Sequence, residues 1–449
     1  MAVNPADSPV FGALYGSDPM RAVWDETTLF RRMLEVEGAL ATVQGSLGVI
    51  PGTAAAEIAA AAGTVALDTT ELAASVRRVG YPVVGIVAAL SRASGEAGRW
   101  THWGATTQDI LDTAAALQIR DGLALLRADL LATIAALARL AARHRDTLMA
   151  GRTHLQQALP TTFGLKVASW LQPLLGDVAR LDALRPRVER LQFGGAVGTL
   201  ASLGDRGIAV SEALAAGLGL AMPAAPWHAC RDGVAEAACA LGLLCGGLAK
   251  IATDVVLLAQ TEVDEVAEPY LAGRGGSSTM PQKRNPIASE YILASARVVQ
   301  ALVPVMLGAM AADHERATGP WQAEPLALPQ AFVLTHGALL HARALAEGLV
   351  VNPERMRQNL DRAGGLIMAE AVMMGLAPKL GREAAHHAVK HACDAALAGC
   401  TSLYDALMAE PEIAAVGGDA VRAMLEPGAY LGSTGAFVDR VVAAARAVT

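Results

Sequence analysis

The feature that most constrains the fold is the length of the helical patterns between residues 110 and 348. Apolar residues recur at helical spacing through successive stretches, at 110–145, 161–191, 232–268, 287–312 and 329–347. These stretches are longer than ordinary globular helices, and they are apolar over much of their circumference. Such helices must bury more than one face, which requires a bundle and favours further subunits around it.

Composition agrees with a helical chain. Of the 449 residues, 53% are hydrophobic but only 4% are aromatic. A core rich in Ala, Leu and Val favours helices packed through small and branched side chains over a β-sandwich. The chain is about three times a typical domain length, so several domains or one elongated architecture are possible. We predict an all-α fold.

Proline, glycine and polar stretches divide the helical patterns into three regions. Shorter patterns fill residues 28–94, and a polar stretch at 100–109 follows them. After Asn352-Pro353 the patterns shorten again, at 353–359, 366–380 and 382–398. We therefore predict an N-terminal helical domain (1–105), a central long-helix bundle domain (106–350) and a small C-terminal helical domain (351–449).

Charge and cysteine content narrow the range of partners. The formal net charge is -7 without a long basic run, which argues against nucleic acid or an anionic membrane as a partner and favours a small molecule. Five cysteines without disulfide or metal spacing indicate reduced thiols. The N-terminus lacks signal-peptide features, and the apolar stretch 238–250 is expected to be a buried helix too short to span a bilayer. We predict a cytoplasmic protein.

A polar loop at 273–286 is the strongest functional signal. Its glycines at 273, 275 and 276 give a hinge ahead of the helical pattern that begins at 287. Ser277, Lys283 and Asn285 then supply a possible base, a cation and an amide. The loop is therefore expected to close over an anion.

Other polar segments interrupt the apolar helices. In the segment 101–109, hydroxyls and amides at a helix start can donate to a carboxylate, although by itself a helix cap at Thr106 or Thr107 is the better explanation. In the segment 151–158, His154 is the preferred proton handler, oriented by Glu290. Asn285 is expected to cap the following helix, with Pro286 in its first turn. A histidine in such a loop is by itself more often structural.

Further segments rank second. A glycine-rich turn at 192–199 and Arg231 at 227–232 fit carboxylate binding, but Arg231 and Asp232 could equally form a local salt bridge. The charged segment 313–316, which contains Arg316, could be only a solvated face. His387 and His391 have a usable metal-ligand spacing, but no third ligand stands nearby in the sequence, so no metal is predicted.

The loop resembles the signature of the fumarase/aspartase superfamily, Gly-Ser-Ser-x-Met-Pro-x-Lys-x-Asn-Pro, at every specified position from Gly276 to Pro286. The threonine-rich segment, the Arg-Thr-His-Leu-Gln segment and the Gly-Ala-x-Gly-Thr turn occur in the order that this superfamily has. The resemblance implies an all-α homotetramer with a central twenty-helix bundle and active sites each assembled from three subunits. It also implies that no organic cofactor or metal takes part.

The resemblance assigns roles residue by residue. Ser277 would be the catalytic base with Ser278 beside it, and His154, oriented by Glu290, would bind substrate or act as an acid. Removing a proton next to a carboxylate creates a dianion, which preorganised donors and cations must stabilise. The expected substrate-binding residues are His102, Thr106, Thr107, Gln108, Arg152, Thr153, Gln156, Arg231, Lys283, Asn285 and Arg316. The substrate would be a dicarboxylate or tricarboxylate.

Within the superfamily the chain most resembles 3-carboxy-cis,cis-muconate cycloisomerases and adenylosuccinate-lyase-like members, through segments 193–203, 226–232, 313–321 and 359–375. Bacterial cycloisomerases generally carry a bulky apolar residue where this chain has His154. The retained histidine favours anti β-elimination of an N- or O-substituted succinate with release of fumarate. Lactonisation of 3-carboxymuconate is the alternative. A structural protein on the same fold is a third possibility, against which Ser277, His154 and Lys283 argue.

Overall fold

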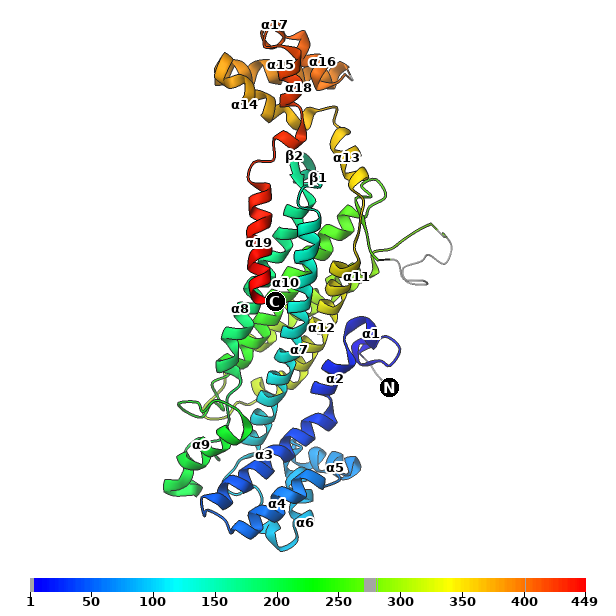
Figure 1. The fold of residues 1–449 in the computed structure, drawn as a ribbon. Coiled ribbons are helices and arrows are strands. Elements are labelled where there is room, and N and C mark those ends of the chain that lie inside the picture. Colours follow the sequence, from blue (N-terminus) through cyan, green and yellow to red (C-terminus); the bar gives the residue numbers. More distant parts are fainter. Residues whose placement is uncertain (1–3, 270–279, 281, 400) are drawn as a thin grey trace. The chain divides into compact units, whose positions relative to one another are not determined.

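The computed structural model of the protein describes residues 4–269, 280, 282–399 and 401–449. The described chain is mostly helix, with two small antiparallel sheets (Figure 1). The predicted all-α fold is confirmed.

The N-terminal elements are short to medium helices: η1 (Pro5–Asp7), α1 (Gly12–Tyr15), α2 (Asp18–Trp24), α3 (Glu26–Ser46), α4 (Gly52–Thr64), α5 (Thr69–Val79), α6 (Val83–Ala93) and η2 (Gly95–Trp100). The long helices are α7 (Thr107–Arg143), α8 (Phe163–Val188), α10 (Asp232–Leu258), α11 (Ile287–Gly308) and α12 (Pro320–Gly348). Between them lie β1 (Leu148–Thr153), β2 (Gln156–Thr162), η3 (Ala201–Arg206), α9 (Gly207–Leu218) and β3 (Val266–Ala267). The C-terminal elements are β4 (Val350–Val351), α13 (Pro353–Asp361), η4 (Leu366–Met368), α14 (Ala369–Leu380), α15 (Arg382–Gly399), α16 (Leu403–Ala409), α17 (Pro411–Ala414), α18 (Gly418–Met424), η5 (Pro427–Ala429) and α19 (Thr434–Val448).

The chain forms two compact units. Unit 1 comprises Met1–Asp129, Asp177–Leu248 and Tyr291–Leu340, and unit 2 comprises Leu130–Gly176, Ala249–Glu290 and His341–Thr449. Each of the long helices contributes residues to both units. The three domains predicted from the sequence stay a prediction.

In unit 1, α3 lies along α4 and also packs against α9. Asp25 begins α3 by accepting the Thr28 N–H at 2.6 Å. The inner face of α3, with Met33, Val36 and Leu40, is almost fully buried in an apolar cluster. Burial of this face stabilises the helix more than its propensity does.

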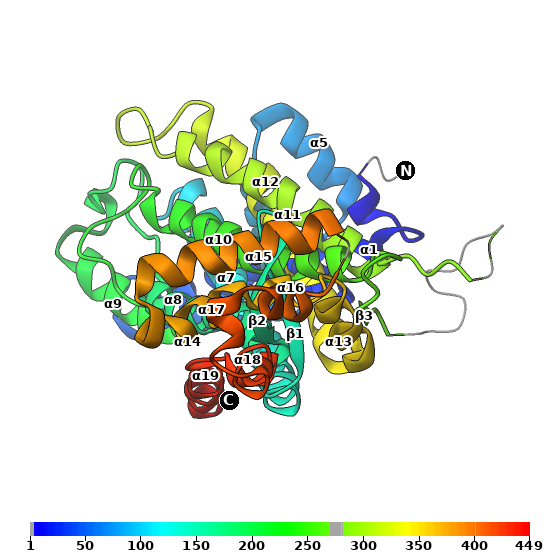
Figure 2. The ribbon, with the colours of Figure 1, turned by 90° about the horizontal axis from the view of Figure 1, so that it is seen from above.

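In unit 2, β1 and β2 form an antiparallel hairpin in which Thr153 pairs with Gln156. Helices α14, α15, α16 and α18 pack around their own core of residues such as Val372, Leu376 and Leu407, and Figure 2 views this group from above. Elsewhere in unit 2, α19 is attached through Asp439, which accepts two hydrogen bonds of 2.8 Å from Arg145.

Several helix bounds differ from the predicted ones. Helix α10 ends at Leu258 instead of near 268, because the chain turns at Asp264 (φ 52°) and Val266 pairs with Val351 in a small sheet. Helix α12 begins at Pro320 instead of 329 and continues through two further prolines. The stretch 238–250, expected to be too short to span a bilayer, lies inside α10, which by length and composition could cross one. The β1–β2 hairpin was not predicted.

Candidate active site

The predicted site residues divide between the two units. Unit 1 holds His102, Thr106, Thr107, Gln108, Arg231 and Arg316, and unit 2 holds Arg152, Thr153, His154, Gln156, Lys283, Asn285 and Glu290. Ser277 and Ser278 lie outside the described residues.

In unit 1, one buried carboxylate organises the start of α7. Asp109 accepts the Thr106 N–H at 3.0 Å and the N–H groups of Gly194 and Gly195 at 2.9 Å each. Its Oδ1 also lies 2.7 Å from Nε2 of His228. Asp109 has no exposed surface, so these hydrogen bonds replace its water. One side chain thus holds the threonine segment, the glycine-rich turn and the segment around His228 together.

Arg231 is enclosed by carboxylates. Its guanidinium donates to Asp112 at 2.7 and 3.0 Å and to Glu324 at 2.8 and 2.5 Å, and only 3% of the residue is exposed. Burial by itself lowers the pKa of Arg231, but the two carboxylates outweigh burial and raise it. Burial raises the pKa of Glu324 against the opposing effect of Arg231. This geometry favours a structural role for Arg231, and its assignment to substrate binding stays a prediction.

Two further predicted site residues in unit 1, Gln108 and Arg316, are also engaged within the chain. Gln108 donates to Asp112 at 3.0 Å and to the His228 carbonyl at 2.9 Å. Arg316 donates to the Thr106 hydroxyl at 3.0 Å and to the Ala196 carbonyl at 3.1 Å. The Thr106 hydroxyl is therefore a partner of Arg316, and it is the Asp109 side chain that caps the Thr106 N–H at the start of the helix.

In unit 2, His154 occupies the tip of the β1–β2 hairpin. Because Thr153 pairs with Gln156, the turn contains only His154 and Leu155, and both have positive φ, at 50° and 63°. Two left-handed residues define a type I′ turn, which normally takes Asn-Gly. A histidine and a leucine there strain the backbone. The residues from Thr153 to Gln156 are all exposed.

Arg152, just before the tip, is engaged elsewhere. It donates to both oxygens of Glu265 at 2.9 and 2.6 Å, and Glu265 is fully buried. Asn359 donates to the same carboxylate at 2.9 Å. This pair fixes the base of the hairpin, and a substrate contact by Arg152 stays a prediction.

The end of the signature segment leads into α11. The helix begins at Ile287, so Pro286 precedes its first turn. Its N-terminus is capped by a distant carboxylate, because Glu268 accepts the N–H groups of Ala288 and Ser289 at 2.9 Å each. The expected Asn285 cap is thus replaced by Glu268, while Glu290 in the first turn is exposed. Within the described part of this single chain no hydrogen bond joins Glu290 to His154.

Several acids that organise these segments were missed from the sequence: Glu37, Asp109, Asp112, Glu265, Glu268 and Glu324. The spacing of Asp109 and Asp112, three apart at a helix start, was a usable signal. Glu37 within an apolar helix face was another.

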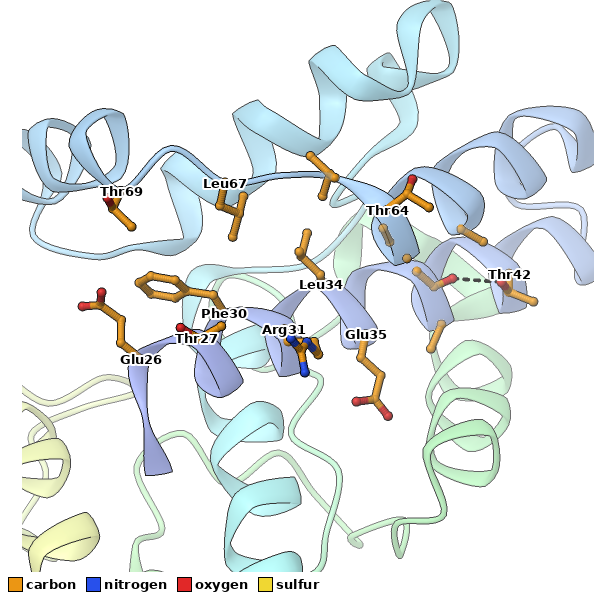
Figure 3. Close-up of a pocket in the computed structure, with 16 residues that line it drawn as sticks. Glu26, Thr27, Phe30, Arg31, Leu34, Glu35, Thr42, Thr64, Leu67 and Thr69 are labelled. Carbon is orange, nitrogen blue, oxygen red and sulfur yellow. Dashed lines mark hydrogen bonds between the residues drawn. The ribbon is translucent and has the colours of Figure 1, made fainter. Parts of the chain in front are cut away.

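A cavity of about 640 Å³ lies elsewhere in unit 1, between α3, α4 and the segment that follows α4 (Figure 3). Phe30, Leu34 and Leu67 line it, with Glu26, Arg31 and several threonines around them. It includes none of the predicted site residues. Because the chemistry-bearing residues lie in other segments, we do not place the active site in this cavity.

The comparisons with known proteins agree with the fold. Residues 15–301 match the family described as Lyase, and residues 365–441 match the family described as Adenylosuccinate lyase C-terminus. The 3-carboxy-cis,cis-muconate cycloisomerase of Pseudomonas aeruginosa is 46% identical over 448 residues, which cover 99% of this chain and 97% of that protein.

Two solved structures are similar over nearly the whole chain. The fumarate lyase from Mesorhizobium sp. BNC1 is 47% identical, with a TM-score of 0.91, and the match covers 96% of this chain and 98% of that one. The 3-carboxy-cis,cis-muconate lactonizing enzyme from Pseudomonas putida is 41% identical, with a TM-score of 0.94 and coverage of 98% and 100%.

The helical fold and these matches define an enzyme of the lyase class. More specifically, the chain belongs to the fumarase/aspartase superfamily and is a lyase or a cycloisomerase of that superfamily. The expectation of an enzyme and the family resemblance are confirmed. The elimination favoured by His154 is supported only at this coarser level, and the two Pseudomonas relatives above favour the cycloisomerase alternative.

Proposed function

We propose that this enzyme is a cycloisomerase that lactonises 3-carboxy-cis,cis-muconate. The observation that carries the proposal is the match to the Pseudomonas aeruginosa cycloisomerase over 99% of this chain. In the reaction, an oxygen of one substrate carboxylate adds to a carbon–carbon double bond, and the neighbouring carbon gains a proton. No atom leaves and no redox step occurs, so the chemistry needs only acid, base and charge stabilisation.

The proposed residue roles follow from the charge that develops. Addition of the oxygen places negative charge on the carbon next to a carboxylate, which gives an aci-carboxylate dianion. We assign its stabilisation to Lys283 and Asn285, and the holding of the carboxylates to Thr106 and Thr107. These are groups that donate hydrogen bonds or carry positive charge. Gln108 is fully buried and donates to Asp112 and to the His228 carbonyl, so we assign it the support of the threonine segment.

Proton transfer is assigned to Ser277, with Ser278 beside it. In the elimination direction a serine alkoxide would take the proton from carbon, and in the addition direction the hydroxyl would return it. The alkoxide needs nearby cations and N–H donors, which Lys283 and the loop backbone would supply. Thr153 and Gln156, both exposed beside the hairpin tip, are proposed to bind a further carboxylate.

A second candidate is anti β-elimination from a substituted succinate with release of fumarate. His154 favours it, because the imidazole is held at an exposed and strained hairpin tip. A solvent-facing imidazole can donate a proton to a departing nitrogen or oxygen. The similarity to the Mesorhizobium fumarate lyase points in the same direction. In this candidate Glu290 would orient His154 from another subunit.

The deciding experiment is a substrate panel. The purified protein is incubated with 3-carboxymuconate, adenylosuccinate, argininosuccinate, aspartate, malate, iminodisuccinate and nitrosuccinate, and absorbance reports loss of the muconate or formation of fumarate. Loss of 3-carboxymuconate without fumarate from any succinate supports the cycloisomerase. Fumarate from a succinate without muconate turnover replaces it with the lyase. Inactivity on the whole panel contradicts both candidates.

Ser277→Ala tests the proposed base. We expect kcat to fall by about 10² to 10⁴-fold while substrate still binds, because a general acid–base group typically contributes that much. Stopped-flow absorbance measures kcat, and calorimetry measures binding. Ser169→Ala is the matched control, since the Ser169 hydroxyl is exposed and bonds only within α8. Near-normal turnover by Ser277→Ala would assign the base to another residue.

We further propose that the enzyme is a cytoplasmic homotetramer with shared active sites. By length and composition α10 and α11 could cross a membrane, with mean hydropathy of 1.8 and 1.5. In the most apolar 18-residue stretch of each helix, only 50% of α10 and 28% of α11 are buried within the chain. We propose that other copies of the same chain bury the apolar surfaces of α10 and α11 that this chain leaves exposed. The described cysteines, Cys230, Cys239, Cys245 and Cys393, are free thiols, which suits a reducing compartment.

A further inference from the structure

Glu37 is a buried acid with an unusual environment. It lies on the inner face of α3 and is 1% exposed, among apolar neighbours that include Met33 and Leu40. Its Oε1 lies 2.5 Å from Nδ1 of His102. Its Oε2 is buried and has no hydrogen-bond partner among the described residues. Such a carboxylate is costly unless a positive charge compensates it.

The segment that carries His102 is held in place without Glu37. Gln44, two helical turns further along α3, donates to the Trp103 carbonyl at 2.7 Å. Thr106 is held by Asp109 through its N–H and by Arg316 through its hydroxyl. Glu37 is therefore not needed to fix the position of this segment. Its distinct contribution is a negative charge beside the imidazole of His102.

The geometry also selects which nitrogen of His102 faces outward. Glu37 takes Nδ1, so Nε2 is left as the outer nitrogen of a side chain that is 21% exposed. His102 has a left-handed backbone (φ 61°), which is uncommon for a residue other than glycine. Because Glu37 occupies Nδ1, Nε2 is the ring nitrogen left to meet a ligand.

We propose that Glu37 is a positioning residue that keeps His102 charged, so that its Nε2–H can donate to a carboxylate of the substrate. The inference rests on the proposed function, because it takes a polycarboxylate as the ligand. A neutral His102 with Nδ1–H bonded to Glu37 would present a lone pair at Nε2, and this lone pair would repel a carboxylate. Carboxylate binding by His102 thus requires the second proton.

The charges around His102 act in the required direction. Burial by itself lowers the pKa of His102, but the charge of Glu37 and the hydrogen bond to it outweigh burial, so the pKa of His102 is raised. Asp109 of α7 adds a smaller effect of the same sign. Among the described residues these are the charged groups that shift His102.

The first test is the pH dependence of ligand binding. Tricarballylate, a saturated tricarboxylate that cannot react, is titrated by calorimetry into wild type and Glu37→Gln between pH 5.5 and 9. A glutamine still accepts from Nδ1 but lacks the charge. We expect about tenfold weaker binding at pH 7.5, equal binding at pH 5.5, and loss of affinity about one pH unit lower than in wild type. Glu35→Gln, an exposed acid on the same helix, is the matched control and should match wild type.

The second test separates charge from structure. In a His102→Gln background, adding Glu37→Gln should change tricarballylate binding by less than twofold, since the group on which it acts is gone. An equal loss in both backgrounds would make Glu37 merely structural and overturn the inference. Glu37→Asp, which keeps the charge, should retain at least half of the pH shift and serves if the glutamine variant does not fold.

A readout independent of any substrate distinguishes this inference from the proposed function. In protein labelled with ¹³C-histidine, the resonance that disappears in His102→Gln is followed against pH. Its titration midpoint should fall in Glu37→Gln, and an unchanged midpoint overturns the inference even if tricarballylate binds. If wild type binds no polycarboxylate, the proposed function and the ligand role of His102 both fail, while the titration still decides whether Glu37 charges His102.

Discussion

At the scale of single residues, Arg231 illustrates what one sequence can and cannot reveal. Its neighbour Asp232 offered a local salt bridge, but the structure pairs Arg231 with Asp112 and Glu324, which are 119 and 93 positions away. Sequence adjacency indicated that this arginine would meet an acid, but not which one. Partners so distant in the chain are set by how the helices pack, and no local pattern encodes that.

Removing the Arg231 charge should destabilise the fold strongly. In Arg231→Met two buried carboxylates, Asp112 and Glu324, lose their cation, and we expect the free energy of unfolding at pH 8 to fall by about 3 to 5 kcal/mol. Urea denaturation followed by circular dichroism measures this. Arg187→Met is the control, because its pair with Glu236 is exposed and should be worth at most about 1 kcal/mol.

The same variant has a predicted pH dependence. Burial already raises the pKa of Glu324 in the folded protein, and loss of Arg231 would raise it further above its unfolded value. The folded state then binds more protons than the unfolded state, so its stability increases as the pH falls through that folded pKa. The deficit of Arg231→Met should therefore shrink between pH 8 and pH 5. A deficit that stays constant or grows over this range contradicts the assignment.

At the scale of elements, the long helices were predictable and the hairpin was not. The spacing of apolar residues located α7, α8 and α11, because in a long buried helix apolar residues recur at helical spacing along the whole length. The β1–β2 hairpin escaped because its tip is His154-Leu155 instead of a glycine-containing pair, so the usual turn signal is missing. A turn that keeps unfavourable residues is consistent with the proposed functional role of His154.

The strain at the hairpin tip can be measured. Leu155→Gly should raise the free energy of unfolding by about 1 kcal/mol, because glycine adopts positive φ without a Cβ clash. Leu155→Val should lower it by a similar amount, since a β-branched residue is worst there. Thermal unfolding of both variants tests the difference. Leu165→Gly, within α8, is the control and should destabilise as any helix glycine does. Equal effects of both Leu155 changes would contradict a strained turn.

At the scale of the whole molecule, the sequence predicted more than the fold of one chain. Long helices with apolar circumference implied neighbours, and the single chain leaves Val298 and Val305 of α11 exposed by 42% and 43%. These residues are seven apart, so they lie on one face of the helix. Motifs could propose site residues but not how they meet, and in the proposed tetramer a site shared between subunits would have no complete geometry within one chain.

Val305→Glu should therefore break the proposed tetramer. The new glutamate would be buried in an apolar contact between subunits without a positively charged partner. Because the subunits are identical, this cost would recur at every equivalent contact. Gel filtration with light scattering should give a mass below that of four chains. Turnover should also be lost, because each proposed active site is shared between subunits. Val84→Glu is the matched control: Val84 in α6 is equally exposed, at 43%, but lies outside the long helices. If Val305→Glu remains tetrameric and active, this face of α11 is not a contact between subunits. If both variants dissociate alike, the effect comes from the added charge and not from the α11 face.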